Sequence, residues 1–236
     1  MHRLVPFLAA TATVFANREQ HVFHQDSSQI PTTEREHWMR TAISALDTLT
    51  SPCPFAAFGT AIVNHSSTGE SNLICIGANA IGSTGNPTLH GEIAGIDNCS
   101  SILTDPKGRF KLPAAEALQA YRDLSLYTTA EPCPMCASAI RWAGFKECIF
   151  GTRIPTLIDL GWDQIDFSTE HLFRHSGSLG TETTLMGGVL EDETDVLLAW
   201  QFRHDRRCPL GCQRSGDGGA CLPDPEAARE QWPEEL

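Results

Sequence analysis

Two cysteines and an earlier histidine have the residue types and spacing of a metal site. In Glu131-Pro132-Cys133-Pro134-Met135-Cys136, the two thiols lie on one face of a predicted first helical turn, so both sulfurs can reach one ion. The helix dipole favours the thiolate, which is the form that binds metal. With His90 as the third ligand, a tetrahedral Zn²⁺ keeps its fourth position for water, whereas a structural site closes with four protein ligands. The pattern therefore predicts a catalytic zinc site.

Glu92, two residues after His90, supplies the acid–base group that such chemistry needs. Zinc lowers the pKa of a bound water, and a side chain must still carry the proton from that catalytic water to a leaving amine. His-x-Glu followed by Pro-Cys-x-x-Cys is the signature of the zinc nucleobase and nucleoside deaminases, in which the glutamate is not a ligand. Cys-x-x-Cys alone also fits a redox pair or a disulfide. Together, each at the start of a predicted helix, the two motifs indicate a zinc hydrolase.

Length and charge limit the architecture and the partners. The 236 residues suit one domain with a sizeable core. The net charge of −12 provides no broad basic surface, which disfavours a nucleic-acid partner. No stretch after the first residues is long and apolar enough to cross a bilayer. Four histidines outside the motif are expected to be ordinary surface residues: His65, His171, His175 and His204.

The first residues have the pattern of a secretory signal peptide. Residues 1–16 combine Arg3 with an apolar run that ends in a small residue, and a polar lead follows at 17–32. The alternative is an N-terminal helix that stays in the protein. The pattern predicts a secreted protein, with a cytoplasmic one as the alternative.

The remaining cysteines bear on the same question. If the compartment is oxidising, some of them should pair. Residues 207–236 are rich in Cys, Pro and Gly and read as an acidic tail without a core of its own. We expect disulfides among the tail cysteines, one of them to Cys53, and we interpret Cys75 and Cys148 as plain buried thiols. The seven cysteines outside the motif are Cys53, Cys75, Cys99, Cys148, Cys208, Cys212 and Cys221.

Strand-like and helical patterns alternate along residues 33–206, which predicts one α/β domain with three layers. Helices are expected from Thr33, from the two metal motifs, and over 114–121, 155–160, 169–175 and 192–206. Strands are expected over 58–63, 73–80, 124–128 and 147–150, a weaker element over 185–190, and a glycine-rich loop over 81–87.

Two segments carry a family resemblance. Thr88-Leu89-His90-Gly91-Glu92-Ile93 and the run from Leu126 to Cys136 resemble the cytidine and deoxycytidylate deaminase superfamily, closest to its guanine deaminase and tRNA adenosine deaminase branch; residues 187–193 extend the match. The resemblance implies an α-β-α sandwich with a five-stranded mixed sheet, in most cases a homodimer. It also implies that His90, Cys133 and Cys136 bind zinc and that Glu92 is the proton shuttle.

The same resemblance suggests residues that bind the substrate. Asn79 takes the place of an asparagine that hydrogen-bonds the base, Trp142 that of a tryptophan shaping a purine pocket, and Asp163 that of an aspartate reading a purine amino group. A turn residue, a packing residue and a helix cap are the respective structural alternatives. A free purine base or nucleoside, guanine first, is the expected substrate.

Departures from that branch keep other substrates open. Gly91 stands where the branch usually has alanine, and both this feature and residues 97–99 look more like fungal cytosine deaminase. Cytosine or a cytidine compound is therefore the second expectation, and a tRNA adenosine the third. A secreted zinc-fold binding protein without activity is the alternative that is not an enzyme.

Overall fold

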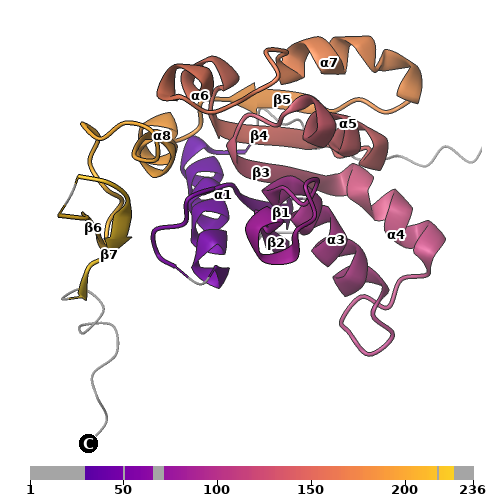
Figure 1. Ribbon diagram of the computed structural model, residues 1–236. Helices are drawn as coiled ribbons and strands as arrows, with labels where there is room; N and C mark the ends of the chain where they lie inside the picture. The colour runs from indigo at the N-terminus through magenta and orange to yellow at the C-terminus, as the bar shows by residue number, and fades with distance from the viewer. Residues whose placement is uncertain (1–29, 50, 66–71, 217, 226–236) are drawn as a thin grey trace, which may run out of the picture.

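A computed structural model describes residues 30–49, 51–65, 72–216 and 218–225 (Figure 1). The predicted signal peptide over 1–16 and most of the polar lead lie outside these residues. The described part contains a five-stranded sheet in the order β2-β1-β3-β4-β5. Its strands are β1 (Gly59–Asn64), β2 (Asn72–Ala78), β3 (Leu124–Ala130), β4 (Glu147–Thr152) and β5 (Thr184–Gly187). β2 and β3 both pair with β1 in antiparallel fashion, whereas β3, β4 and β5 run parallel, so the predicted mixed sheet is confirmed.

Helices cover both faces of the sheet. The helices are α1 (Thr32–Ser44), α2 (Ile81–Thr84), α3 (Gly91–Thr104), α4 (Ala114–Ala120), α5 (Pro134–Ala143), α6 (Ile154–Leu160), α7 (Thr169–His175) and α8 (Glu191–Ala199). Short 3₁₀ turns are η2 (Ala45–Thr48), η3 (Tyr121–Asp123) and η4 (Gly177–Leu179). No helix among the described residues has the length and apolar character that spanning a membrane requires.

Alternating strand residues build one core on each face. Ala61 and Val63 of β1 pack with Trp38 and Met39 of α1, while the intervening Ile62 packs on the opposite side with residues of α3 and α5. This is the period of two that a sheet buried on both faces requires. The predicted α-β-α layers are therefore confirmed (Figure 1).

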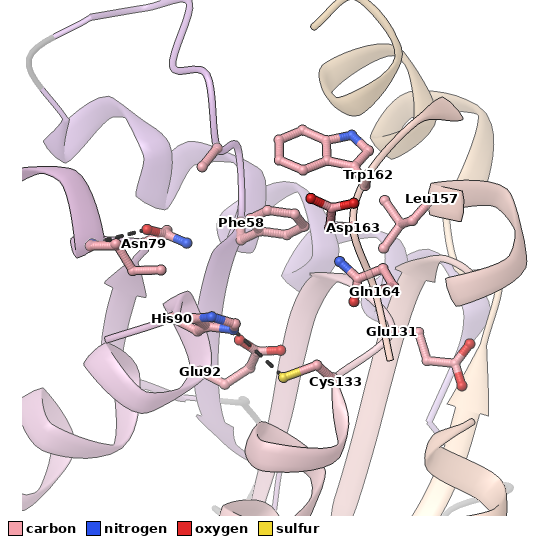
Figure 2. Close-up of a pocket in the computed structure, with 12 residues that line it drawn as sticks. Phe58, Asn79, His90, Glu92, Glu131, Cys133, Leu157, Trp162, Asp163 and Gln164 are labelled. Carbon is pink, nitrogen blue, oxygen red and sulfur yellow. Dashed lines mark hydrogen bonds between the residues drawn. The ribbon is translucent and has the colours of Figure 1, made fainter. Parts of the chain in front are cut away.

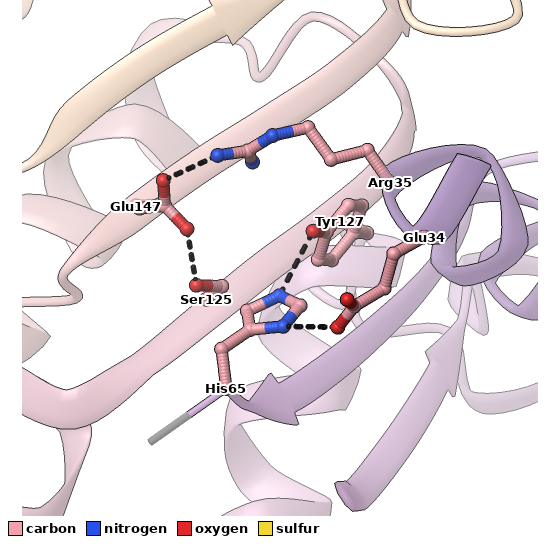
Figure 3. A network of polar contacts seen from close by, with 6 residues as sticks. All are labelled: Glu34, Arg35, His65, Ser125, Tyr127 and Glu147. Carbon is pink, nitrogen blue, oxygen red and sulfur yellow. Dashed lines mark hydrogen bonds and ion pairs between the residues drawn. The ribbon is translucent and has the colours of Figure 1, made fainter. Parts of the chain in front are cut away.

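A buried polar network ties α1 to the sheet (Figure 3). Arg35 forms an ion pair of 3.0 Å with Glu147, whose other oxygen accepts the Ser125 hydroxyl at 2.7 Å. His65 lies at 3.0 Å from Glu34 Oε1 through Nδ1 and at 2.9 Å from the Tyr127 hydroxyl through Nε2. His65 is 7% exposed, so its interpretation as a surface residue was wrong. His65 directly follows β1, and its ring contacts Tyr127 of the neighbouring β3.

The structure differs from the prediction in one helix and one loop. The helix expected over 192–206 stops at Ala199, because Trp200 is buried and Gln201 folds back: its side-chain amide donates to Leu197 O at 2.8 Å and thereby satisfies a carbonyl of the last turn. The loop expected over 81–87 contains α2, which Gly85 ends in a left-handed conformation at φ +72°.

The C-terminal segment is more ordered than predicted. Strands β6 (Cys212–Arg214) and β7 (Cys221–Pro223) pair in antiparallel fashion, and disulfides join Cys208 to Cys221 and Cys53 to Cys212. Cys221 is buried together with Cys53 and Trp200, which both lie outside residues 207–236, so the described part of the tail packs against the α/β domain. The bond to Cys53 agrees with the sequence-based expectation. A short hairpin stapled in this way needs few apolar side chains to hold its shape.

Cys75 and Cys148, both predicted to be buried free thiols, differ in the structure. Cys75 forms a third disulfide, to Cys99 of α3, which corrects the interpretation of Cys75 as a plain thiol. The sulfurs meet because α3 packs directly on β2: a Cβ at Gly77 would lie 2.2 Å from the backbone nitrogen of Gly95. Among the described cysteines, Cys148 remains a buried free thiol.

Candidate active site

The three predicted zinc ligands come together at the end of the sheet where β2 and β3 finish. Figure 2 shows two of them, His90 and Cys133, facing each other. His90 is the N-cap of α3, Cys133 is the N-cap of α5 and Cys136 lies in the first turn of α5. One potential ligand atom from each lies within 4.8 Å of the other two, and Cys133 Sγ is 3.7 Å from Nδ1 of His90. An imidazole and two sulfurs at the N-termini of two helices are a donor set that zinc prefers. The residues therefore fit the metal.

Charge is arranged to favour binding of a cation. A hydrogen bond from the Cys136 thiol, together with one from His90, lowers the pKa of Cys133 to about 4 against the opposing effect of burial. Bonding to the Cys133 thiolate and burial in turn raise the pKa of Cys136. The pKa of His90 is raised by its contact with Cys133. Metal ligands bind in their deprotonated forms, so a divalent cation at this site would displace protons from these residues.

Glu92 is the acid–base group beside these ligands. It lies in the first turn of α3, is 5% exposed and lines the same pocket as His90 and Cys133. Burial raises the pKa of its carboxyl above the usual value. A carboxyl group whose pKa is raised in this way is better able to hold a proton and return it to a reacting group.

Gly91 has a packing reason that the sequence does not reveal. A Cβ at this position would lie 2.4 Å from the carbonyl oxygen of Phe58. The chain of Phe58, which leads into β1, therefore passes directly over the start of α3. This close approach brings Phe58 next to Glu92 at the wall of the pocket.

His90, Cys133 and Glu92 line a cavity of about 190 Å³. Four parts of the chain share its wall: the residues just before β1, the stretch from the end of β2 into α2, the region of the metal motifs, and α6 with the segment that follows it. Its lining residues are Ala56, Phe58, Asn79, Ile81, His90, Glu92, Glu131, Cys133, Leu157, Trp162, Asp163 and Gln164. The cavity thus presents aromatic faces, side-chain amides and the exposed carboxylate of Asp163 to a small planar ligand.

Two of the three residues suggested for substrate binding lie at this cavity. The side-chain oxygen of Asn79 accepts from Ile81 N at 3.1 Å, which fixes the amide with its nitrogen toward the pocket (Figure 2). Asp163 lines the same wall in the segment between α6 and α7, and it caps no helix. Trp142 is 77% exposed near the end of α5 and does not line this cavity, so its role in substrate binding stays a prediction. The face of α5 that points inward carries Cys136 and Ile140 instead.

Sequence reasoning missed several residues of this wall, among them Glu131, Phe58 and Trp162. Glu131 directly precedes the cysteine motif, and that proximity was the available signal. Its two oxygens accept the backbone N–H groups of Ile154 at 3.0 Å and Thr169 at 2.9 Å. Phe58 had no signal in the sequence, since it looked like the first residue of a strand. Its ring reaches the cavity because of the Gly91 contact.

Residues 32–152 match the family "Cytidine and deoxycytidylate deaminase zinc-binding region", and the chain belongs to this family. Guanine deaminase of Bacillus subtilis is 30% identical over 106 residues, which are 45% of this chain and 56% of that protein. A protein of Schizosaccharomyces pombe named "Probable cytosine deaminase" is 50% identical over 82 residues, 32% of this chain and 49% of that one. The tRNA-specific adenosine deaminase of Bacillus subtilis is 32% identical over 124 residues, covering 50% and 61%. This chain spans roughly half the length of these curated relatives.

Solved structures support the fold. A guanine deaminase from Nitrosomonas europaea aligns with a TM-score of 0.50 at 19% identity, over 72% of this chain and 82% of that chain. The structure of a mutant in complex with 8-azaguanine aligns with a TM-score of 0.50 at 21% identity, over 71% and 82%. At this identity the likeness shows a common fold.

Proposed function

We propose that the protein is a zinc-dependent hydrolytic deaminase that acts on a nucleobase or nucleoside, with a guanine-type purine favoured. The observation that carries the proposal is the position of Glu92: a buried carboxyl group in the same cavity as His90 and Cys133. A structural zinc site has no use for a proton shuttle. The intact Glu92 therefore argues against a binding protein that keeps the zinc fold without activity.

Each residue of the cavity then has a role. His90, Cys133 and Cys136 would hold Zn²⁺, which supplies a water activated at neutral pH. Glu92 takes a proton from the attacking water and delivers it to the exocyclic amine, which leaves as ammonia. The remaining protein groups bind and orient the planar base.

The shape and chemistry of the pocket support a single heterocyclic base. A cavity of about 190 Å³ is smaller than the roughly 300–1,000 Å³ of sites for drug-sized ligands. Phe58 and Trp162 offer aromatic surfaces for a flat ring. The Asn79 amide can donate to a ring nitrogen or carbonyl, and the Asp163 carboxylate can accept from ring N–H or amino groups. Guanine presents both kinds of group, and two of the similar proteins are named guanine deaminases.

Cytosine is the second candidate substrate. The 50% identity to the Schizosaccharomyces pombe protein and the glycine at position 91 favour it. A tRNA adenosine is disfavoured, because phosphate contacts need Lys and Arg and this chain carries a net charge of −12.

Ammonia release from a panel of bases tests the proposal. Zinc-loaded protein would be incubated with guanine, cytosine, adenine and their nucleosides, beside a Glu92→Gln variant as the blank. We expect release from guanine above all others and none with the variant. Cytosine as the preferred base would replace the guanine assignment. Release from none, with stoichiometric zinc, would replace the deaminase by a binding protein.

We also propose that the protein is secreted and acts as a homodimer. Three disulfides among the described cysteines support an oxidising compartment. The family resemblance supports the dimer, and the exposed Trp142 indole provides apolar surface that a second copy could cover. Detection in culture medium tests secretion, and sedimentation of the purified protein tests the dimer.

A further inference from the structure

The segment after α8 packs behind the aromatic wall of the pocket. Trp162, which lines the cavity, has its ring centroid 5.0 Å from that of Phe202 and 5.5 Å from that of Phe55. Phe58, the other aromatic residue of the wall, lies 5.2 Å from Trp162. Edge-to-face and tilted pairs at these distances are attractive beyond their buried area. The wall is thus continuous with residues that do not touch the cavity.

Two hydrogen bonds hold this aromatic group in one arrangement. The indole nitrogen of Trp162 donates to Leu198 O at 2.8 Å, at the end of α8. The side-chain amide of Gln201 donates to Phe55 O at 2.8 Å as well as to Leu197 O. The orientation of the Trp162 ring and the position of the chain at Phe55 are therefore both set by the last turn of α8.

A disulfide bond ties the chain near Phe55 to the C-terminal hairpin. Cys53, two residues before Phe55, is joined to Cys212 of β6 across 159 residues of sequence. The residue after Phe55 is Ala56, which lines the cavity. Residues 53–58 otherwise have an irregular backbone between η2 and β1. The disulfide consequently anchors an irregular stretch of the pocket wall to the C-terminal hairpin.

We propose that the Cys53–Cys212 disulfide and the rings of Phe55 and Phe202 form a positioning clamp for the substrate-facing wall made by Phe58 and Trp162. This inference rests on the proposed function for its kinetic consequence. Phe55 and Phe202 are positioning residues, since they act through Trp162 and not on the substrate. Loosening the clamp weakens binding of the base and leaves the acid–base step at Glu92 in place.

The test compares two pairs of disulfide variants. Cys53→Ala with Cys212→Ala removes the clamp bond, whereas Cys208→Ala with Cys221→Ala removes a bond inside the tail and keeps the tether. In the first pair we expect faster amide hydrogen exchange at 56–58 and 162–164 and unchanged exchange in α3 and α5. In the second pair we expect the wall to stay protected. Equal exchange in both pairs, or an unchanged wall in the first, would overturn the proposal.

Phe55 provides a second test in which both disulfides remain. Phe55 is 54% exposed, so its replacement is compatible with folding. Phe55→Ala should raise KM for the preferred base by roughly threefold to tenfold with little change in kcat, and Phe55→Tyr should restore the wild-type KM. A fall in kcat at unchanged KM would overturn the clamp. If the wild type releases ammonia from no base, the proposed function fails, and hydrogen exchange still decides whether the clamp exists.

Discussion

One carboxylate oxygen of Glu131 accepts the backbone N–H of Thr169 at 2.9 Å. The other oxygen accepts that of Ile154 at 3.0 Å, and the Thr169 hydroxyl donates to Pro132 O at 2.8 Å. The residue next to the cysteine motif thereby holds the first residues of α6 and α7. The segment between these helices carries Trp162 and Asp163. The Glu131 side chain therefore connects the cysteine motif to the substrate-facing wall.

Replacing Glu131 with alanine should destabilise the protein. Glu131 is 8% exposed, so its loss leaves two buried N–H groups without an acceptor. We expect the free energy of unfolding to fall by about 2–4 kcal/mol, from two hydrogen bonds to a charged group. Glu131→Gln should cost less, because its amide keeps one acceptor oxygen. Urea unfolding measures both, and exposed Glu170→Ala on α7 is the control, with an expected change within about 0.5 kcal/mol. A loss for Glu131→Ala no larger than the control would refute the role.

Replacing Glu92 with glutamine should separate metal binding from turnover. Gln cannot accept and return the proton, so ammonia release should fall by about 10²–10⁴-fold. Zinc content should stay at the wild-type value, because the proposed ligands are His90, Cys133 and Cys136 and not Glu92. Metal analysis beside the ammonia assay makes the measurement, and Glu116→Gln on exposed α4 is the matched control. An active Glu92→Gln variant would refute the assignment of Glu92 as the proton shuttle.

Replacing Cys133 with alanine should remove zinc and activity together. Two remaining ligands do not make a stable tetrahedral site. Cys148→Ala is the control, since this free thiol is fully buried in the core and belongs to another cluster of residues. The control should keep one zinc per chain. Zinc retained in Cys133→Ala would show that the ion binds elsewhere.

Replacing Gly91 with alanine should disturb the pocket wall. The added Cβ would lie 2.4 Å from the Phe58 carbonyl oxygen, so the backbone must move. Overpacking of this kind typically costs about 1–3 kcal/mol. Thermal unfolding measures the loss, and Gly82→Ala in α2, where a Cβ meets nothing within 4 Å, is the control. Equal stability of the two variants would contradict the close approach.

The network around His65 makes stability depend on pH (Figure 3). Burial lowers the pKa of His65 below 6.5, although Glu34 and Glu147 act in the opposite direction and Arg35 adds to the lowering. As the pH falls through 6.5, the unfolded chain takes up a proton that folded His65 takes up at a lower pH, so this contribution to stability declines in that window. His65→Gln should show a smaller decline in the urea midpoint across the same window. An identical decline in both proteins would remove His65 as the cause.

The motifs made it predictable from sequence alone that His90, Cys133 and Cys136 lie together and that Glu92 shares a pocket with His90 and Cys133. His90, Cys133 and Cys136 have side chains whose chemistry and spacing leave few other uses, and each stands where a helix begins. The alternation of strands and helices predicted the layers for a similar reason, because period and turn chemistry are local properties. The Cys53 bond to the tail was also within reach of cysteine counting.

Only the tertiary structure placed the wall of the pocket. Phe58 reaches the cavity because Gly91 lets the two backbones approach, and Trp142 lies outside it because the inward face of α5 is taken by other residues. Trp162 is oriented by Leu198 and Phe202, which follow it by tens of residues. Candidate metal-binding residues can be recognised by their side-chain chemistry, which the sequence displays directly. The shape of a pocket depends on contacts between distant segments, which side-chain types alone do not specify.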